Sequence, residues 1–202
     1  KLLTKYEFEK LIKFKLNKKN ILITFHPVTL ENNTSKKQFQ ELLNAINDLE
    51  DTNIIFTKTN SDLNGKVINQ MIDQYIILNP ETAIGFKSLG QLRYLSALQY
   101  VDVVIGNSSS GLMEAPSFKI ATINIGTRQK GRIRGSSVID CSPNKTDIKK
   151  TIKKVYSKQF QKSLKDVDNP YDKGSASKKI VEILKDFQIP KTLIKKFYDI
   201  TF

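Results

Sequence analysis

The sequence is poor in the residues that build disulfides, zinc sites and membrane spans. It contains one cysteine, Cys141, and one histidine, His26, among 202 residues. A lone cysteine excludes an intramolecular disulfide, and no cluster of Cys and His residues is present to bind zinc. No apolar run reaches about 18 residues, and the first residues lack a signal-peptide core. We therefore expect a cytoplasmic protein without a membrane segment or a bound metal.

Arginine is also scarce, although the chain is basic. Lysine and arginine together number 33 and the net charge is +13, but only four residues are arginine: Arg93, Arg128, Arg132 and Arg134. Three of the four fall in one segment, where forked guanidinium donors suit a phosphate or a carboxylate. The alternative is that they pair with surface acids.

The excess positive charge has a different distribution. Residues 144–202 hold 15 lysines against seven acidic residues, so most of the excess lies in the last third of the chain. These lysines are scattered rather than interleaved with aromatic residues, which is typical of a solvated surface. No RNA-binding signature or recognition-helix pattern accompanies them. We expect no nucleic-acid partner.

Short apolar runs of strand length alternate with helix-period segments, which is typical of a parallel sheet with crossover helices. The predicted strands are residues 21–25, 53–57, 75–78, 101–105, 121–125 and 138–141. The predicted helices are residues 2–14, 35–49, 65–72, 89–99, 111–118, 147–156 and 175–187. A capping box of Ser35 and Gln38 is expected to open the second of these helices. The sequence thus predicts an α/β fold, a Rossmann-like doubly wound parallel sheet of about six strands with helices on both faces.

The most informative motif follows the predicted strand at residues 101–105. The segment GNSSSG at residues 106–111 leads into a predicted helix, so the hydroxyls of Ser108, Ser109 and Ser110 and the first helical N–H groups form a cradle for phosphate. Glu114 lies about one turn into that helix, where a carboxylate suits the two hydroxyls of a ribose. An ordinary N-capped turn is the alternative for the motif alone. Together, these features predict a nucleoside diphosphate site.

Neighbouring loops are expected to reach the same edge of the sheet, because the carboxyl ends of parallel strands lie together. His26 follows the first predicted strand, and we favour a phosphate contact for it over a structural role. Asn60 follows the second strand and suits the nucleotide, although turn formation explains it equally well. Arg128 follows the fifth strand. The residues expected to support the site are Asn107, Ser110, Gly111, Gln129 and Arg132.

Three segments carry a resemblance to a known family: TFHPVTLE at residues 24–31, IGNSSSG at residues 105–111 with Glu114, and INIGTRQKGR at residues 123–132. They closely resemble the hydrolysing UDP-N-acetylglucosamine 2-epimerases of sialic-acid biosynthesis, and the resemblance extends over residues 11–197. It implies a GT-B-like architecture, in which two Rossmann-like domains face each other across a cleft. This chain is similar to the C-terminal half, which holds most of the UDP.

The resemblance implies domain boundaries and residue roles. Residues 1–19 would be a lead-in helix from a missing N-terminal domain, residues 20–187 the UDP-binding domain and residues 188–202 a C-terminal tail. The diphosphate would be bound by His26, Arg128, Ser108 and Ser109, the ribose by Glu114 and the uracil by the backbone around Leu89, with Asn60 near the nucleotide.

The resemblance also implies the chemistry. The family removes the C2 proton of the sugar, eliminates UDP to a glycal and adds water, which gives free N-acetylmannosamine and UDP without a cofactor. Its acid/base carboxylates belong to the other domain, so we expect no catalytic residues in this chain and no turnover by it alone. The partners implied are UDP, a UDP-sugar, the N-terminal domain and further copies of the full-length enzyme.

Four alternatives stay open. Similar enzymes act on UDP-N,N'-diacetylbacillosamine on the way to legionaminic acid, and non-hydrolysing relatives return UDP-N-acetylmannosamine. The sugar lies between the two domains, so this half alone leaves the choice open. Half of a GT-B glycosyltransferase would also carry a phosphate loop and a ribose glutamate, but would need an acceptor site. A basic nucleic-acid-binding domain would explain only the charge.

Overall fold

A single parallel sheet organises the chain. The structure, a computed structural model, describes residues 1–28, 34–59 and 63–188. Its strands follow the order β3-β2-β1-β4-β5-β6, and every neighbouring pair is parallel. Their bounds are β1 Lys19–Thr24, β2 Thr52–Thr57, β3 Ala83–Phe86, β4 Val103–Gly106, β5 Ala121–Ile125 and β6 Val138–Cys141. The predicted Rossmann-like fold is confirmed, and its strand order reverses between β1 and β4.

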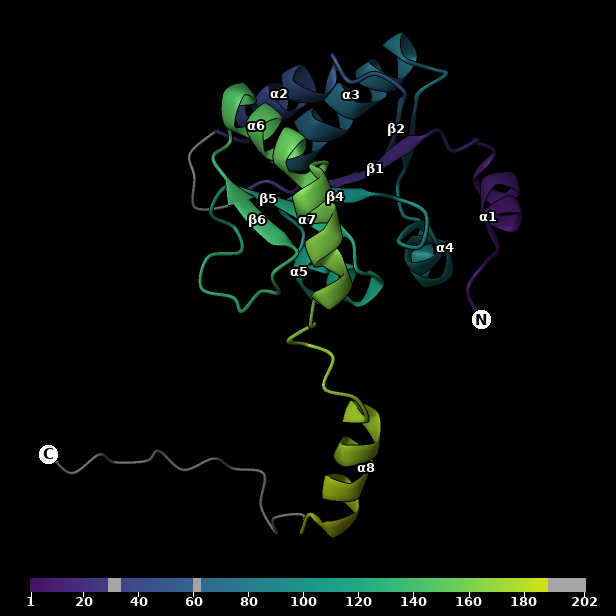
Figure 1. The fold of residues 1–202 in the computed structure, drawn as a ribbon, viewed down its shortest axis with the longest axis vertical. Helices are drawn as coiled ribbons and strands as arrows, with labels where there is room; N and C mark the ends of the chain where they lie inside the picture. Colours follow the sequence, from purple (N-terminus) through teal and green to yellow (C-terminus); the bar gives the residue numbers. More distant parts are fainter. Residues whose placement is uncertain (29–33, 60–62, 189–202) are drawn as a thin grey trace, which may run out of the picture. The chain divides into compact units, whose positions relative to one another are not determined.

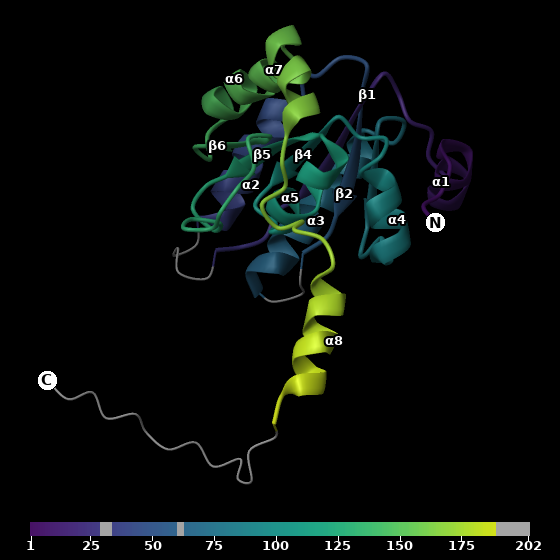
Figure 2. The ribbon, with the colours of Figure 1, turned by 60° about the horizontal axis from the view of Figure 1, so that its bottom comes forward.

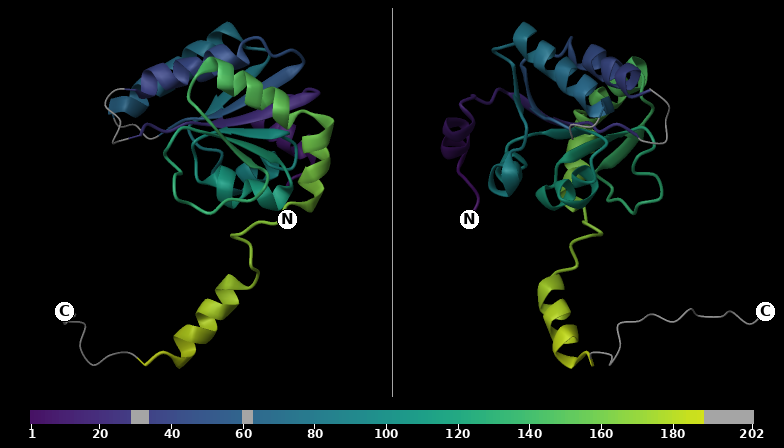
Figure 3. Two further views of the ribbon diagram at one scale, coloured as in Figure 1. Left: turned by 60° about the vertical axis from the view of Figure 1, so that its left-hand side comes forward. Right: turned by 180° about the vertical axis from the view of Figure 1, so that it is seen from behind.

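Helices cover both faces of the sheet. One face carries α2 (Ser35–Ile46), α3 (Leu63–Leu78) and α6 (Lys145–Val155), and the other carries α1 (Lys5–Ile12) and α4 (Gly90–Ala97) (Figures 1 and 3). Helices α1 and α4 lie side by side (Figure 2). The remaining helices are α5 (Ser110–Met113), η1 (Ala115–Phe118), α7 (Lys158–Ser163), η2 (Leu164–Asp166) and α8 (Ala176–Asp186).

Each face of the sheet has its own core. In β1, Ile21 and Ile23 point into the core beneath α2 and α3, and Leu22 points into the core beneath α1 and α4. Side chains alternate between faces along a strand, so a sheet covered on both sides needs apolar residues at consecutive positions. This explains why the strands appear in the sequence as short continuous apolar runs.

The strand predicted at residues 75–78 is wrong. These residues form the last turn of α3, and the third strand is β3. Tyr75 and Ile76 lie three and four positions after Ile72, so they continue the helix face that packs on the core. Helix α3 also lies close above β3, because a Cβ on Gly85 would come within 2.6 Å of the Ile76 Cδ1 atom.

Two predicted helix details also differ. The N-cap residue of α2 is Thr34, and its side chain makes no capping hydrogen bond. Ser35 is the first residue of the helix, so Ser35 and Gln38 do not form the expected capping box. The Gln38 side-chain amide instead donates to the Thr34 hydroxyl at 3.2 Å. The helix predicted over residues 111–118 ends after one turn, and η1 follows it. Pro116 explains the break, because it has no N–H to continue the α-helical hydrogen bonds.

The chain divides into two compact units, Lys1–Asp172 and Lys173–Phe202. Helix α1 belongs to the first unit, where Phe8 is fully buried and the Leu3 N–H donates to the Ser96 hydroxyl at 3.0 Å. Helix α8 belongs to the second. The expected domain of residues 20–187 leaves out α1 and includes α8, and these boundaries stay a prediction. Within the described ranges, none of the helices has the length and apolar character that a membrane span requires.

Candidate functional site

Gly106 lets β1 and β4 approach each other where they end. Its φ is +137°, and a Cβ built there would lie 1.9 Å from the Thr24 carbonyl oxygen. The next residue, Asn107, donates its N–H to the same carbonyl at 3.1 Å. Only glycine fits this conformation and this contact. The loop after β4 therefore begins directly beside the end of β1, at the point where the strand order reverses.

Asn107 connects three of the predicted loops. Its side-chain oxygen accepts from the His26 N–H at 2.7 Å, and its amide donates to the His26 carbonyl at 2.8 Å. Its own carbonyl accepts from Arg128 Nη1 at 3.0 Å and from Gln129 Nε2 at 2.7 Å. Asn107 and Gln129 are each 1% exposed, so both are buried below the surface of this edge of the sheet and hold its loops by hydrogen bonds. The structure thus brings His26 and Arg128 to the same residue.

The His26 ring is held in place by the loop after β2. Its Nδ1 atom lies 2.8 Å from the Thr59 hydroxyl, and the Thr59 backbone is fixed by Asn69, which accepts from its N–H at 3.0 Å and donates to its carbonyl at 3.1 Å. The loop after β2 therefore orients the ring, and Asn107 holds the His26 backbone. Asn60, predicted to lie near the nucleotide, falls outside the described residues.

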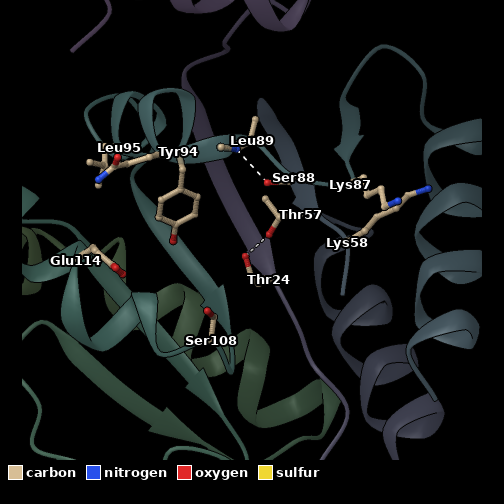
Figure 4. Close-up of a pocket in the computed structure, with 12 residues that line it drawn as sticks. Thr24, Thr57, Lys58, Lys87, Ser88, Leu89, Tyr94, Leu95, Ser108 and Glu114 are labelled. Atoms are coloured by element: carbon tan, nitrogen blue, oxygen red, sulfur yellow. Dashed lines mark hydrogen bonds between the residues drawn. The ribbon is translucent and has the colours of Figure 1, made fainter. Parts of the chain in front are cut away.

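A cavity of about 470 Å³ opens at this edge of the sheet (Figure 4). The described residues that line it are Thr24, Thr57, Lys58, Lys87, Ser88, Leu89, Gly90, Gln91, Tyr94, Leu95, Ser108 and Glu114. Three predicted site residues, Leu89, Ser108 and Glu114, thus face one pocket. His26, Ser109 and Arg128 are not among the residues that line it. His26 follows the end of β1, Ser109 is next to Ser108, and Arg128 contacts the loop after β4 through Asn107.

The loop that precedes α4 is held by an arginine. Arg93 Nε donates to the Leu89 carbonyl at 2.6 Å, and its guanidinium carbon lies 6.0 Å from the centre of the Phe86 ring. Gly90 has a φ of +66° and donates its N–H to the Ser88 hydroxyl at 3.1 Å. The backbone around Leu89, predicted to meet a base, is therefore fixed by its own side-chain contacts.

Ser110, predicted to support the phosphate site, contacts a neighbouring helix. Its hydroxyl is hydrogen bonded to the hydroxyl of Tyr94, from the neighbouring helix α4. Helix α5 spans only Ser110–Met113, so its dipole adds little to anion binding. Among the described residues, Ser108 is thus the serine of the motif that lines the cavity.

Glu114 lies at the end of α5 and is half-buried. Its Oε2 atom is buried and has no hydrogen-bond partner. Burial raises the pKa of the Tyr94 hydroxyl to about 12, and the nearby charge of Glu114 contributes to this rise. Glu114 is also the one carboxylate among the described residues that line the cavity. A buried acceptor without a partner suits a ligand that brings hydroxyl donors.

The three arginines near residue 130 have different surroundings. Arg128 contacts the Asn107 carbonyl, and desolvation, followed by the charge of Arg132, lowers the pKa of its guanidinium. Arg132 is exposed. Arg134 forms an ion pair with Asp140, so the surface-pairing alternative holds for this residue. Of the three, Arg128 is the one tied to the loop after β4.

Sequence reasoning missed several residues of the cavity. Thr24 and Thr57 are paired in register at the ends of β1 and β2, and their hydroxyls are hydrogen bonded to each other. Two threonines that end neighbouring strands were an available signal. Lys58, which is ion paired with Asp73 at 2.5 Å, directly follows Thr57 and shares that signal. Tyr94 had none, because it comes to the cavity from α4, through a contact with the distant residue Ser110.

The cavity offers hydroxyls, two lysines, a backbone turn and a single carboxylate, which suits an anionic ligand with hydroxyl groups. Within the described part of the chain, no group of three or more His, Cys, Asp or Glu side chains could hold a metal ion. The arrangement resembles a binding site more than a pair of acid/base groups.

Comparisons with known proteins point to one family. Residues 2–185 match the family described as UDP-N-acetylglucosamine 2-epimerase. The chain is 41% identical over 199 residues to the GDP/UDP-N,N'-diacetylbacillosamine 2-epimerase (hydrolyzing) of Campylobacter jejuni, and the match covers 98% of this chain and 51% of that protein. It is 39% identical over 190 residues to the polysialic acid biosynthesis protein P7 of Escherichia coli, covering 92% and 47%.

A solved structure agrees in fold. The UDP-GlcNAc 2-epimerase from Neisseria meningitidis, bound to UDP-GlcNAc, aligns with a TM-score of 0.64 at 19% identity, covering 90% of this chain and 48% of that one. The chain spans about half the length of each of these relatives.

Proposed function

The chain belongs to the UDP-N-acetylglucosamine 2-epimerase family, and we propose that it is the UDP-binding, C-terminal half of a hydrolysing 2-epimerase. The observation that carries the proposal is the cavity at the switch point of the sheet. There, Ser108, the backbone of Leu89 and the unpartnered carboxylate of Glu114 meet. In doubly wound sheets, ligands bind at this point, outside the carboxyl ends of the strands.

In the proposed complex, each part of the nucleotide meets a different loop. Glu114 accepts hydrogen bonds from the two ribose hydroxyls, and the turn at Leu89 lies against the uracil. The diphosphate lies near Ser108 and Ser109 and receives charge-assisted hydrogen bonds from Arg128 and His26. The contacts of Asn107 support this arrangement, because they tie the loops of His26 and Arg128 to the loop that carries both serines.

The proposed reaction divides the work between two domains. A base removes the C2 proton of the sugar, UDP leaves as an anion and water adds to the resulting glycal. The residues of this chain stabilise the negative charge of the departing UDP, chiefly through Arg128, His26 and the serine loop. The acid/base groups come from the other half of the enzyme. This division is consistent with a cavity in which the described residues supply a single carboxylate, Glu114.

The proposed substrate is a UDP-linked 2-acetamido sugar. The resemblance in the sequence favours UDP-N-acetylglucosamine, and the Escherichia coli relative named for polysialic acid biosynthesis supports this choice. UDP-N,N'-diacetylbacillosamine is the second candidate, because the Campylobacter jejuni relative, at 41% identity, is named for it.

A turnover assay tests the proposal with both sugars. The 202-residue chain and a full-length enzyme that contains it are each incubated with UDP-N-acetylglucosamine and with UDP-N,N'-diacetylbacillosamine, and released UDP and free sugar are measured. We expect no release by the chain alone, and UDP with an epimerised free sugar from one substrate by the full-length enzyme. Hydrolysis by the chain alone would overturn the division of labour. A full-length enzyme that releases neither product from either sugar would overturn the proposed activity.

A further inference from the structure

A tyrosine of α4 contacts the turn that carries Glu114. The Tyr94 hydroxyl is hydrogen bonded to the Ser110 hydroxyl, at the first residue of α5. The Ser110 carbonyl in turn accepts from the Glu114 N–H at 2.9 Å. Two hydrogen bonds therefore connect Tyr94 to the backbone of the carboxylate residue, within a single helical turn.

The opposite side of the same turn is fixed by β5 and by the segment after η2. The Thr122 hydroxyl donates to the Gly111 carbonyl at 2.7 Å, and a Cβ on Gly111 would come within 2.6 Å of the Thr122 Cγ2 atom. The Asn169 amide donates to the Met113 carbonyl at 2.7 Å. These contacts hold α5 against the sheet, while Tyr94 holds it from α4.

Tyr94 also lines the cavity, together with Glu114 and Ser108 (Figure 4). Its hydroxyl is neutral near neutral pH, as in tyrosines generally, and burial raises its pKa further, to about 12. It therefore acts as a neutral hydrogen-bonding partner. The Glu114 carboxylate, in contrast, has a buried oxygen without any partner and depends on the turn for its position.

We propose that Tyr94 is a positioning residue for ribose recognition: its hydrogen bond to Ser110 holds the α5 turn so that Glu114 faces the ribose hydroxyls. This inference rests on the proposed function, because Glu114 is assigned to the ribose there. It adds a role for Tyr94 and reassigns Ser110 from the phosphate to the support of this turn.

The test compares UDP with 2'-deoxy-UDP, which lacks one of the two hydroxyls. Calorimetry gives the dissociation constants of both ligands for the unmodified chain and for Tyr94→Phe, Ser110→Ala and the double variant. We expect the unmodified chain to prefer UDP, and Tyr94→Phe to reduce that preference about threefold to tenfold, the size of one lost neutral hydrogen bond. Ser110→Ala should have the same effect, and the double variant no further effect, because both changes remove one interaction.

Tyr100→Phe is the matched control. Tyr100 is also half-buried and follows α4, but its hydroxyl donates to the Leu3 carbonyl at 2.7 Å, away from the cavity. Tyr100→Phe should leave the preference for UDP over 2'-deoxy-UDP unchanged. Thermal unfolding of Tyr94→Phe and Tyr100→Phe measures any loss of stability in each.

The outcomes separate the inference from the proposed function. An unchanged preference in Tyr94→Phe would overturn the inference, as would equal weakening of both ligands together with a lower Tm, since that result marks a structural role. A loss of preference in Ser110→Ala but not in Tyr94→Phe would also overturn it, because Ser110 would then contact the ligand itself. If the unmodified chain binds UDP and Glu114→Gln weakens that binding, the proposed function stands in all these cases. If the unmodified chain does not bind UDP, both fail.

Discussion

Glu114→Gln removes the charge of the proposed ribose ligand while it preserves the size of the side chain. The Glu114 Oε2 atom is buried without a hydrogen-bond partner, and the residue sits at the end of a turn held by Tyr94 and Ser110. The substitution breaks no side-chain hydrogen bond at this oxygen. We therefore expect the free energy of unfolding to change by less than about 1 kcal/mol.

Binding should respond much more strongly. Hydrogen bonds to a charged acceptor contribute about 1.5–3 kcal/mol, compared with about 0.5–1.5 kcal/mol for neutral pairs. Glu114→Gln replaces the charged acceptor of the two ribose hydroxyls with a neutral one. It should therefore weaken UDP binding by about 1–3 kcal/mol, or roughly fivefold to 150-fold. Isothermal titration calorimetry measures the affinity, and urea unfolding measures the stability.

The control is Glu81→Gln, on an exposed residue in the loop between α3 and β3, at the opposite edge of the sheet from the cavity. It removes the same charge and should leave UDP affinity unchanged. If both variants weaken binding equally, attraction to the whole charge distribution and not a ribose contact is responsible. Unchanged affinity in Glu114→Gln, or loss of folding, would refute the reasoning.

Three further predictions follow from the loops around the cavity. Arg128→Lys should weaken UDP binding about tenfold, because an ammonium group lacks the rigid, planar fork of donors with which a guanidinium can contact the Asn107 carbonyl and a diphosphate together. Lys149→Ala, which removes a surface ion pair with Asp48, should leave calorimetric affinity unchanged. His26→Ala should lower affinity for UDP but not for uridine, and equal losses would place His26 away from the diphosphate. Gly106→Ala should lower the free energy of unfolding by more than about 3 kcal/mol, because its Cβ would lie 1.9 Å from a backbone oxygen; a near-neutral value in urea unfolding would contradict this.

The sequence was sufficient for the fold because the sheet is buried on both faces. Strand β4, for example, consists entirely of buried residues, so it appears as a short continuous apolar run between helical segments. The run at residues 75–78 is equally apolar and equally short, and its assignment to a strand failed. The spacing of three and four residues from Ile72 to Tyr75 and Ile76 indicates a helix and not a strand. A run of four residues is too short to show that periodicity by itself.

The site was predictable only in part. Leu89 comes after β3, and Ser108 and Glu114 come after β4. The rule that the carboxyl ends of parallel strands meet at one edge was therefore enough to group these residues around one cavity. The contact between Tyr94 and Ser110 depends on how α4 packs beside α5, which no local pattern encodes. The pairing of Arg134 with Asp140 likewise appears only in three dimensions.

The central claim, a nucleoside diphosphate site built by this chain, is tested most directly by calorimetry of the 202-residue chain with UDP and with uridine at physiological salt. The account predicts that UDP binds measurably and more tightly than uridine, because the contacts assigned to Ser108, Ser109, His26 and Arg128 are made only with the diphosphate. Equal affinity for the two ligands, or binding of neither, would contradict it.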